Sequence, residues 1–423
     1  MKIIADLHIH SKYSRAVSGD MTLENIASHA RKKGIQVVAT GDFTHPAWFG
    51  EIKNKLQPAE EGLFNLKPQI SNLKSPDTRF MLTVEIACIY SKGGKVRRLH
   101  HVVFAPTIEA VEKINKKLAW IGNLKSDGRP MLGLDSRKLL EIILEADSRC
   151  VLVPAHCWTP WFSIFGSMSG FDSIEECFDE MSPHIFAVET GLSSDPPMNW
   201  RLSSLDNVSL ISNSDAHSLS KLGREANVFD CGLSYAEIVS AIKERNPERF
   251  LYTIEFFPEE GKYYYDGHRN CGIVFSPEQT KKHNGLCPKC GKKLTVGVLS
   301  RVDELADRKD ELVPDRAKRV PYKSLIPLVE VIAGAKGVGP QTKTVAVEYD
   351  KLISKFGSEF FVLLDAPIDE IEQIVDSKIA EGIKRMREGN VKIEPGYDGE
   401  FGKIKLFDEG EKMEEEKKQK SLF

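Results

Sequence analysis

The stretch Ile3-Ile-Ala-Asp-Leu-His-Ile-His10 opens the chain with an apolar run that ends in two histidines one residue apart. Its aliphatic residues predict a buried strand over Ile3–Leu7. Side chains alternate between the two faces of an extended segment, so we expect His8 and His10 to lie on the same face. The chain therefore begins with a strand that presents two imidazoles side by side at its end.

Similar apolar runs alternate with helical patterns over the first half of the chain. Further strands are predicted at Gln36–Thr40, Met81–Ile89, His101–Ala105, Cys150–Ala155, Phe186–Thr190 and Ser209–Ser212. Helices are predicted at Thr22–Lys33, Glu109–Trp120, Ser136–Ala146 and Ile174–Met181. Seven strands interleaved with helices predict an α/β fold built on a parallel βα array, either open or closed into a barrel.

The amino-acid composition predicts a globular protein and argues against a membrane or secreted one. The 423 residues include 58 Lys and Arg against 61 Asp and Glu, with a net charge of −3, and 41% are hydrophobic. At about 150 residues per domain, this predicts a globular protein of two or three domains. No stretch approaches the roughly 20 apolar residues of a membrane span, and histidines within the first ten residues argue against a signal peptide. We therefore expect a cytoplasmic protein.

The pattern of residue types changes after residue 257, and the sequence predicts four parts of the chain. We expect a βα domain over residues 1–257, a small cysteine-containing module over 258–300, a helical domain over 301–400 and a disordered tail over 401–423. The tail prediction rests on the almost wholly charged stretch Glu409–Lys420.

Histidines and carboxylates stand in or close to the ends of the predicted strands. Besides His8 and His10, they are Asp42, His45, Glu85, His100, His101, His156, Asp215 and His217. Strand ends gather on one rim of a parallel barrel, so these side chains can converge. Such a set suits two or three divalent metals, here Zn²⁺, Mn²⁺ or Mg²⁺, which clamp a phosphoryl group and activate water.

His8-Ile-His10, Glu85, His100, His156 and Asp215-Ala-His217 resemble the polymerase-and-histidinol-phosphatase (PHP) superfamily over residues 1–235. The resemblance implies a distorted seven-stranded βα barrel with a multinuclear metal site that hydrolyses phosphoesters. The family usually has Asp-His after the second strand, where this chain has Thr40-Gly-Asp-Phe-Thr-His45, so Asp42 is the expected ligand and His45 the alternative. The spacing to Ala105 resembles the family's and favours His100 over His101.

Two loops on the expected rim carry further candidates. Trp158, Trp161 and Phe162 can stack on an unpaired base or pack beneath their own loop. Asp195, with Glu189, is expected to act in catalysis by holding a metal-bound water or by accepting a hydrogen bond from substrate.

Three of the eight cysteines form a separate metal motif with a histidine. His268-x2-Cys271 and Cys287-x2-Cys290 have the spacing of a treble-clef or ribbon zinc site, with His283 as an alternative fourth ligand. Four protein ligands leave no open position, so we expect one structural zinc.

Two later motifs point to DNA and to a protein partner. Gly337-Val-Gly339-Pro340 resembles the turn of helix-hairpin-helix modules, whose backbone N–H groups face a DNA phosphate. Gln419-Lys-Ser-Leu-Phe423 resembles the start of a sliding-clamp-binding peptide that lacks its aromatic pair, or else is a frayed tail.

The order of the modules resembles a group of DNA-repair endonucleases within the superfamily. This implies a metal-dependent enzyme that cuts the phosphodiester on the 5′ side of a deaminated base (uracil, hypoxanthine or xanthine) or an abasic site. The alternative is a small-molecule phosphatase that uses the same barrel.

Overall fold

The computed structural model describes residues 1–70, 78–314 and 316–408. The chain forms two compact units, the first comprising Met1–Leu325 with Glu394–Lys403 and the second comprising Ile326–Ile393 with the segment that begins at Ile404. The charged stretch of the predicted tail and the clamp-like Gln419–Phe423 lie outside the described residues.

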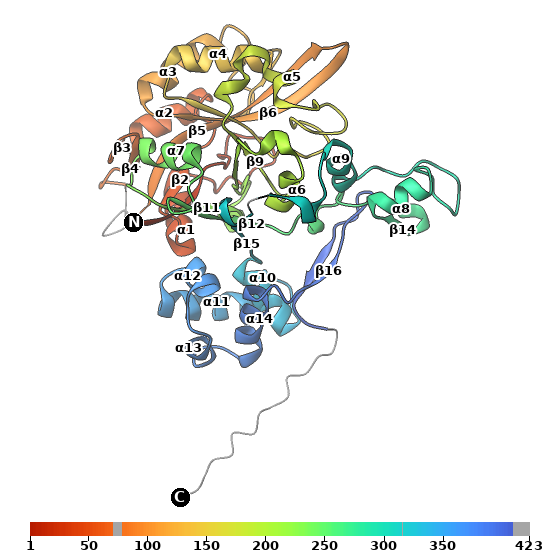
Figure 1. Ribbon diagram of the computed structural model, residues 1–423. Helices are drawn as coiled ribbons and strands as arrows, with labels where there is room; N and C mark the ends of the chain where they lie inside the picture. The colour runs from red at the N-terminus through yellow and green to blue at the C-terminus, as the bar shows by residue number, and fades with distance from the viewer. Residues whose placement is uncertain (71–77, 315, 409–423) are drawn as a thin grey trace, which may run out of the picture. The chain divides into compact units, whose positions relative to one another are not determined.

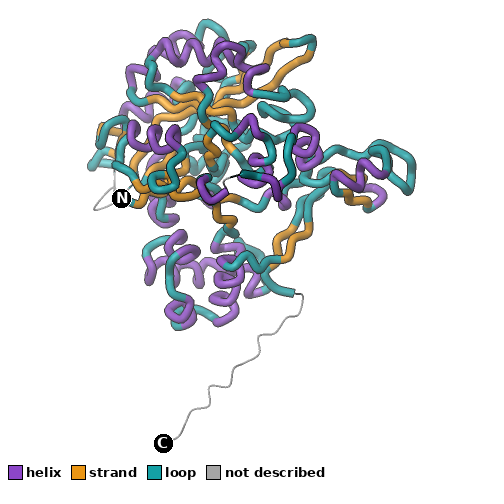
Figure 2. Tube along the Cα trace, in the orientation of Figure 1, coloured by secondary structure: helices purple, strands orange, loops and turns teal. Residues whose placement is uncertain are grey.

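A large mixed sheet forms the centre of the first unit (Figures 1 and 2). Its hydrogen-bonded strands are β1 (Lys2–Asp6), β2 (Val37–Ala39), β3 (Leu56–Pro58), β4 (Leu63–Leu66), β5 (Arg79–Lys92), β6 (Lys95–Ala105), β7 (Met131–Leu132), β8 (Val151–Pro154), β11 (Ala226–Asp230), β12 (Phe250–Glu255) and β15 (Tyr322–Ser324). β9 (Ala187–Glu189) and β10 (Ser209–Ile211) form a separate parallel pair. The α/β class is confirmed, and a strand lies at each of the seven predicted positions.

The array is not wholly parallel, which corrects the prediction. β1, β2 and β5 are parallel, but β6 runs antiparallel to both β5 and β8. β5 and β6 form a long hairpin whose turn contains Gly93 and Gly94, with φ of 62° and 73°. Two successive residues with positive φ favour a tight hairpin turn, so the chain reverses there without a crossover helix.

Helices pack their apolar faces against this sheet. They are α1 (Leu23–Lys33), α2 (Pro46–Lys55), α3 (Ile108–Leu118), α4 (Ser136–Ala146), α5 (Ile174–Phe178), α6 (Pro196–Trp200) and α7 (Tyr235–Glu244). Thr107, for example, caps α3 through its side chain, and the buried positions of that helix recur at Val111, Ile114 and Leu118. This spacing gives one apolar stripe, so α3 is anchored along one face only.

The cysteine-containing module also belongs to the first unit. Its elements are β13 (Asp266–His268), β14 (Ile273–Phe275), α8 (Pro277–Lys282) and α9 (Val298–Leu305). The buried guanidinium of Arg301 in α9 donates to the carbonyl oxygens of Phe165 and Phe171. These contacts and the pairing of β15 with β12 tie residues 301–325 to the first unit, so the helical unit begins at Ile326 and not at residue 301.

The second unit is helical. It contains α10 (Leu328–Lys336), α11 (Lys343–Phe356), α12 (Glu359–Leu364), α13 (Ile368–Glu372) and α14 (Ser377–Arg387). The short strands β16 (Lys392–Glu394) and β17 (Lys403–Lys405) then pair with each other, and their residues are divided between the two units. Among the described helices of both units, none is long and apolar enough to span a membrane.

Candidate metal centre

Two groups of metal-ligating side chains lie in or just after the strands of the first unit, and within each group the candidate ligand atoms lie within 4.8 Å of one another. The first group contains His8, His10, Glu85 and Asp215. The second contains Glu85, His100 and His156. Glu85 belongs to both, so its carboxylate can bridge two metal ions.

The first group has the geometry of a metal site. His10 Nε2 lies 3.1 Å from Asp215 Oδ1 and 3.2 Å from Glu85 Oε2. His8 Nε2 lies 3.7 Å from each of the same two oxygens. Among the described residues, however, His8 Nε2, His10 Nε2 and Asp215 Oδ1 have no hydrogen-bond partner although they are buried. Buried nitrogen and oxygen atoms that converge without hydrogen-bonding one another are suited to bind a divalent ion.

The second group lies on the other oxygen of Glu85. Its Oε1 is 2.7 Å from His100 Nδ1 and 3.0 Å from His156 Nε2, and these two ring nitrogens are 3.2 Å apart. Burial lowers the pKa of His100 to about 4. Its imidazole is therefore neutral at pH 7 and has a lone pair available for a metal.

The carboxylates control protonation in the first group. Burial lowers the pKa of His8, but Glu189 and Glu85 outweigh it and raise that pKa well above its usual value. Burial raises the pKa of Glu85, but His100, Arg129 and His8 outweigh it and lower that pKa well below its usual value. Protons and metal ions therefore compete for the same nitrogens.

The backbone turns sharply where three of the rim residues follow their strands. Asp42, His156 and Asp215 have φ of 51°, 30° and 45°. Residues other than glycine rarely adopt positive φ, and such strain concentrates at functional sites.

Two buried carboxylates contact Nδ1 of the two histidines of the first group, on the ring edge opposite to the candidate ligand atom Nε2. His8 Nδ1 lies 3.0 Å from Glu189 Oε1, and His10 Nδ1 lies 3.1 Å from Asp42 Oδ1. Such contacts fix the imidazole tautomer and direct the other ring nitrogen to the metal. Asp42 and Glu189 thus contact ligand imidazoles and lie outside both groups, and the predicted roles of Asp42 as a ligand and Glu189 in catalysis stay predictions.

Alternation along β6 separates His100 from His101. Glu85 pairs with Val102, so His100, two residues away, shares its face, while His101 points to the other side. His101 Nε2 lies 2.8 Å from Ser136 Oγ, away from the metal groups. Of the two alternatives, His100 belongs to the ligand group.

His45 and His217 lie outside the two groups. His45 caps α2 and stacks on Tyr13, with ring centroids 4.5 Å apart. The ring centroid of His217 lies 4.7 Å from that of His10, and His217 Nδ1 lies 2.8 Å from the backbone oxygen of Asp215. His217 thus borders the first group, and its predicted role as a ligand stays a prediction.

Asp195 caps α6 and lies in neither group. Its Oδ1 accepts a hydrogen bond from the backbone N–H of Met198 at 3.0 Å, and burial raises its pKa to about 7. Asp195 therefore caps α6, and its predicted catalytic role stays a prediction.

The three predicted base-stacking aromatics have different surroundings. Trp158 is 1% exposed, donates from Nε1 to Asn199 Oδ1 at 2.8 Å and packs on Phe165. Of the two alternatives for Trp158, the structure shows the packed one, because its ring belongs to the core. Phe162 lies against His100, with ring centroids 4.6 Å apart, whereas Trp161 is 42% exposed.

Trp161 borders a pocket of about 640 Å³ beside the metal groups. Two lining residues connect the pocket to them. Thr159 Oγ1 lies 3.1 Å from His156 Nδ1, and Arg224 Nε donates to the backbone oxygen of Ser214 at 2.8 Å, next to Asp215. The other walls include Phe256, Tyr263, Tyr264, Lys221 and Lys262. The pocket therefore combines aromatic surface with positive charge.

Arg129 is a site residue that the sequence analysis missed. Its Nη1 donates to Glu85 Oε2 at 3.0 Å, and its side chain is 26% exposed. It lies in an irregular segment before β7, and no local pattern connects it to Glu85, 44 residues earlier.

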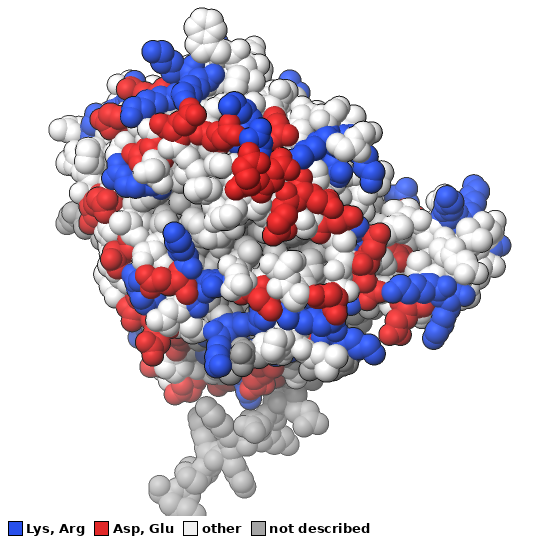
Figure 3. Space-filling model, turned by 45° about the horizontal axis from the view of Figure 1, so that its top comes forward, with Lys and Arg blue, Asp and Glu red and all other residues white. Residues whose placement is uncertain are grey.

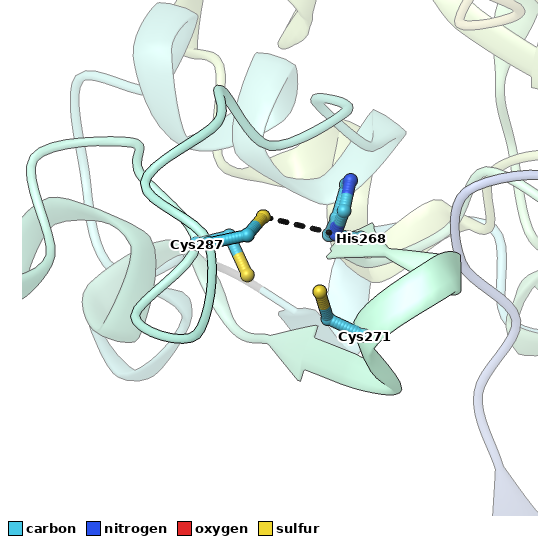
Figure 4. Close-up of side chains that lie close together, drawn as sticks. His268, Cys271 and Cys287 are labelled. Carbon is cyan, nitrogen blue, oxygen red and sulfur yellow. Dashed lines mark hydrogen bonds between the residues drawn. The ribbon is translucent and has the colours of Figure 1, made fainter.

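A third group of ligands lies in the cysteine-containing module (Figure 4). It consists of His268, Cys271, Cys287 and Cys290, again with ligand atoms within 4.8 Å. Cys290 Sγ lies 3.7 Å from His268 Nδ1. His283 stacks on Phe275 instead, with ring centroids 4.8 Å apart. Three thiols and one imidazole fit a tetrahedral zinc site.

In the second unit, α10 and α11 are joined by the predicted Gly-Val-Gly turn. Gly337 ends α10 with φ of 64°, and a Cβ at Gly339 would meet no atom within 4 Å. The backbone of the turn is thus open to a ligand such as a phosphate.

Basic and acidic side chains are unevenly distributed over the surface. Figure 3 shows Lys and Arg side chains gathered at the edges of the face that it presents, apart from an acidic band across its middle. The net charge of −3 therefore hides separate basic areas.

Comparisons with known sequences cover nearly the whole chain. A family model described as the MJ0043 C-terminal domain matches residues 327–390. The uncharacterized protein YqxK of Bacillus subtilis is 31% identical over 422 residues, covering 96% of this chain and 99% of that protein. The uncharacterized protein MJ0043 of Methanocaldococcus jannaschii is 39% identical over 272 residues, which are 62% of this chain and 33% of that longer protein. The chain thus spans about a third of the length of this archaeal relative.

Two solved structures share the fold over almost their full length. The lesion-specific endonuclease PfuEndoQ from Pyrococcus furiosus superposes with a TM-score of 0.84 at 32% identity, covering 96% of this chain and 95% of that one. Endonuclease Q in complex with a 27-mer duplex substrate, with an abasic lesion at the active site, gives 0.82 at 33% identity and covers 96% of each chain.

Proposed function

Because the chain belongs to the endonuclease Q family, whose members are metal-dependent DNA endonucleases, we propose that it is a DNA-repair enzyme that cuts the phosphodiester on the 5′ side of abasic sites and deaminated bases. The proposed deaminated bases are uracil, hypoxanthine and xanthine. The observation that carries the proposal is the convergence of two ligand groups on Glu85 beside a pocket large enough for a nucleoside.

The ligand groups account for the chemistry. Divalent metals held by His8, His10, Glu85, Asp215, His100 and His156 would supply an activated water and neutralise charge on the phosphate. Glu189 and Asp42 hold the first two imidazoles in the required tautomer. Arg129, fixed by Glu85, adds a positive charge at the same point and would hold a phosphate oxygen.

The pocket accounts for lesion recognition. An extruded nucleotide would lie against Trp161 and Tyr263, whose rings stand edge to face with centroids 6.1 Å apart at the wall of the pocket. Lys221 and Lys262 supply charge for its phosphates, and Arg224 ties the pocket wall to the segment that carries Asp215.

The remaining modules would bind the DNA backbone. We assign one structural zinc to His268, Cys271, Cys287 and Cys290, and a phosphate contact to the turn that contains Gly337 and Gly339. We further propose that β1, β2, β5, β6, β8, β9 and β10 are the seven strands of a distorted PHP barrel, and that the enzyme works in the cytoplasm. Contact with a sliding clamp through Gln419–Phe423 stays a prediction.

End-labelled duplexes that differ at one position test the function. They would carry uracil, hypoxanthine, xanthine, an abasic site or an undamaged base, and each would be incubated with a divalent metal or with chelator. We expect a metal-dependent nick immediately 5′ of each lesion and none in the undamaged duplex. Intact DNA, together with phosphate release from small monoesters, would instead identify a phosphatase.

A further inference from the structure

We propose that Trp120 is a stacking platform for a base of the DNA substrate close to the metal groups, with Lys116 and Lys125 holding the adjoining phosphates. The inference rests on the proposed function and adds a second point of contact with the substrate, distinct from the lesion pocket.

Trp120 is unusually exposed for its size. It follows the end of α3 and is 89% exposed, and its neighbour Ile121 is 37% exposed. Ala119 and Gly122, on either side of this pair, line a hollow of about 680 Å³ whose wall includes Phe49. A large apolar side chain beside a partly apolar hollow is the kind of surface that marks a binding site.

One end of this region contacts a segment that adjoins the metal groups, and the other end contacts Glu85 itself. On α3, Asn115 Nδ2 donates to the backbone oxygen of Phe43 at 2.9 Å, and Phe43 adjoins Asp42. At the other end, Arg129 donates to Glu85 at 3.0 Å. Trp120 lies in the segment between these two contacts, five residues beyond Asn115 and nine before Arg129.

Charge favours DNA over a protein partner. Lys116 stands four residues before Trp120, so both occupy the same side of the helix end. Lys116 and Lys125 are exposed, and among the described residues neither ammonium group pairs with a carboxylate. Lys117, by contrast, faces α4 and pairs with Glu145. Protein interfaces are depleted in lysine, whereas aromatic rings flanked by lysines bind unpaired bases and their phosphates.

Four variants test the inference through binding of a labelled duplex with one abasic site, measured on the metal-loaded protein with a non-hydrolysable linkage 5′ of the lesion so that no strand is cut. Trp120→Ala should weaken binding roughly 5- to 150-fold, and Trp120→Phe should restore most of it because a phenyl ring still stacks. Lys116→Ala should lower the slope of log affinity against log salt by about one. The matched Lys117→Ala should leave that slope unchanged, because this lysine is already paired.

Metal content and unfolding temperature should stay at wild-type values in Trp120→Ala, because the side chain is exposed. Wild-type affinity in Trp120→Ala, or equal losses of affinity in the Ala and Phe variants, would overturn the inference. The proposed function would still hold if the wild-type protein cleaved lesion DNA. Unchanged DNA binding would point to a protein partner for Trp120. Failure of the wild type to bind lesion DNA would overturn both proposals.

Discussion

Glu85 is the side chain that joins the two halves of the metal centre, because its two oxygens face different ligand groups. Glu85→Gln keeps its size and removes the charge that two metal ions would share. We expect the loss of at least one metal ion per chain and cleavage of abasic DNA slower by about 10²- to 10³-fold or more. Elemental analysis and single-turnover nicking measure the two effects. His29→Gln, outside both groups, is the control, and equal losses in both variants would contradict the assignment.

Asp42 lies one contact further from the metal and should behave differently. Asp42→Asn removes the carboxylate that orients His10, so metal affinity should fall about 10- to 100-fold. Activity should return when metal is raised to saturation, which a titration of the nicking rate would follow. A variant that stayed inactive at saturating metal would instead place Asp42 among the ligands.

The sequence allowed the members of both ligand groups to be named, because each stands in or next to an apolar run that becomes a strand. The positioning role of Asp42 and the contact of Arg129 could not be predicted in this way. Asp42 contacts a side chain 32 residues away in the chain and Arg129 contacts one 44 residues away. A local sequence pattern does not predict contacts over such separations. The sequence also could not decide between stacking and packing for Trp158, because its burial depends on contacts with Asn199 and Phe165.

At the scale of elements, strand positions were predictable and strand directions were not. Apolar runs mark where strands lie, but the reversal at Gly93 and Gly94 makes β6 antiparallel. α7 was missed although Ser234 caps it and its apolar positions recur with helical spacing, an ordinary signal. α2 begins at a proline after His45, within the loop that had been assigned to ligands.

The cysteine-containing module should depend on its metal. Its strands β13 and β14 have three residues each, too few to be stable without a crosslink. Cys287→Ser should remove one zinc per chain and expose residues 258–300 to proteolysis, while the metal content of the two groups that share Glu85 stays unchanged. Elemental analysis with limited proteolysis checks this. Retention of that zinc would contradict the ligand assignment.

β12 ends in a buried carboxyl that predicts a pH effect on stability. Burial raises the pKa of Glu255 to about 8 from 4.5, with Glu225 close by. The folded state therefore binds more protons than the unfolded state between these values, so the free energy of unfolding should fall as pH rises through this range. Glu255→Gln should reduce that slope in urea unfolding. Exposed Glu237→Gln is the control, and an equal slope in the two variants would contradict the argument.

At the scale of the whole molecule, the sequence motifs predicted where the modules lie, but the predicted module boundaries differ from the boundaries of the compact units. The metal motif over His268–Cys290 suggested a separate module, yet it shares one compact unit with the large mixed sheet. Buried Arg301 explains why, since a charged side chain tied to two carbonyl oxygens of Phe165 and Phe171 binds the two regions together. Only the helical segment from Ile326 forms a unit of its own.

The most direct test of the account is a metal titration of the chelator-treated protein, with nicking of a duplex that contains one abasic site as the readout. The account predicts no nick before metal is added. It then predicts a rate that rises as Mn²⁺ fills two or more sites per chain, with every cut at the lesion. Nicking at full rate without added metal, or a protein that binds no ion beyond the single zinc of the cysteine site, would contradict it.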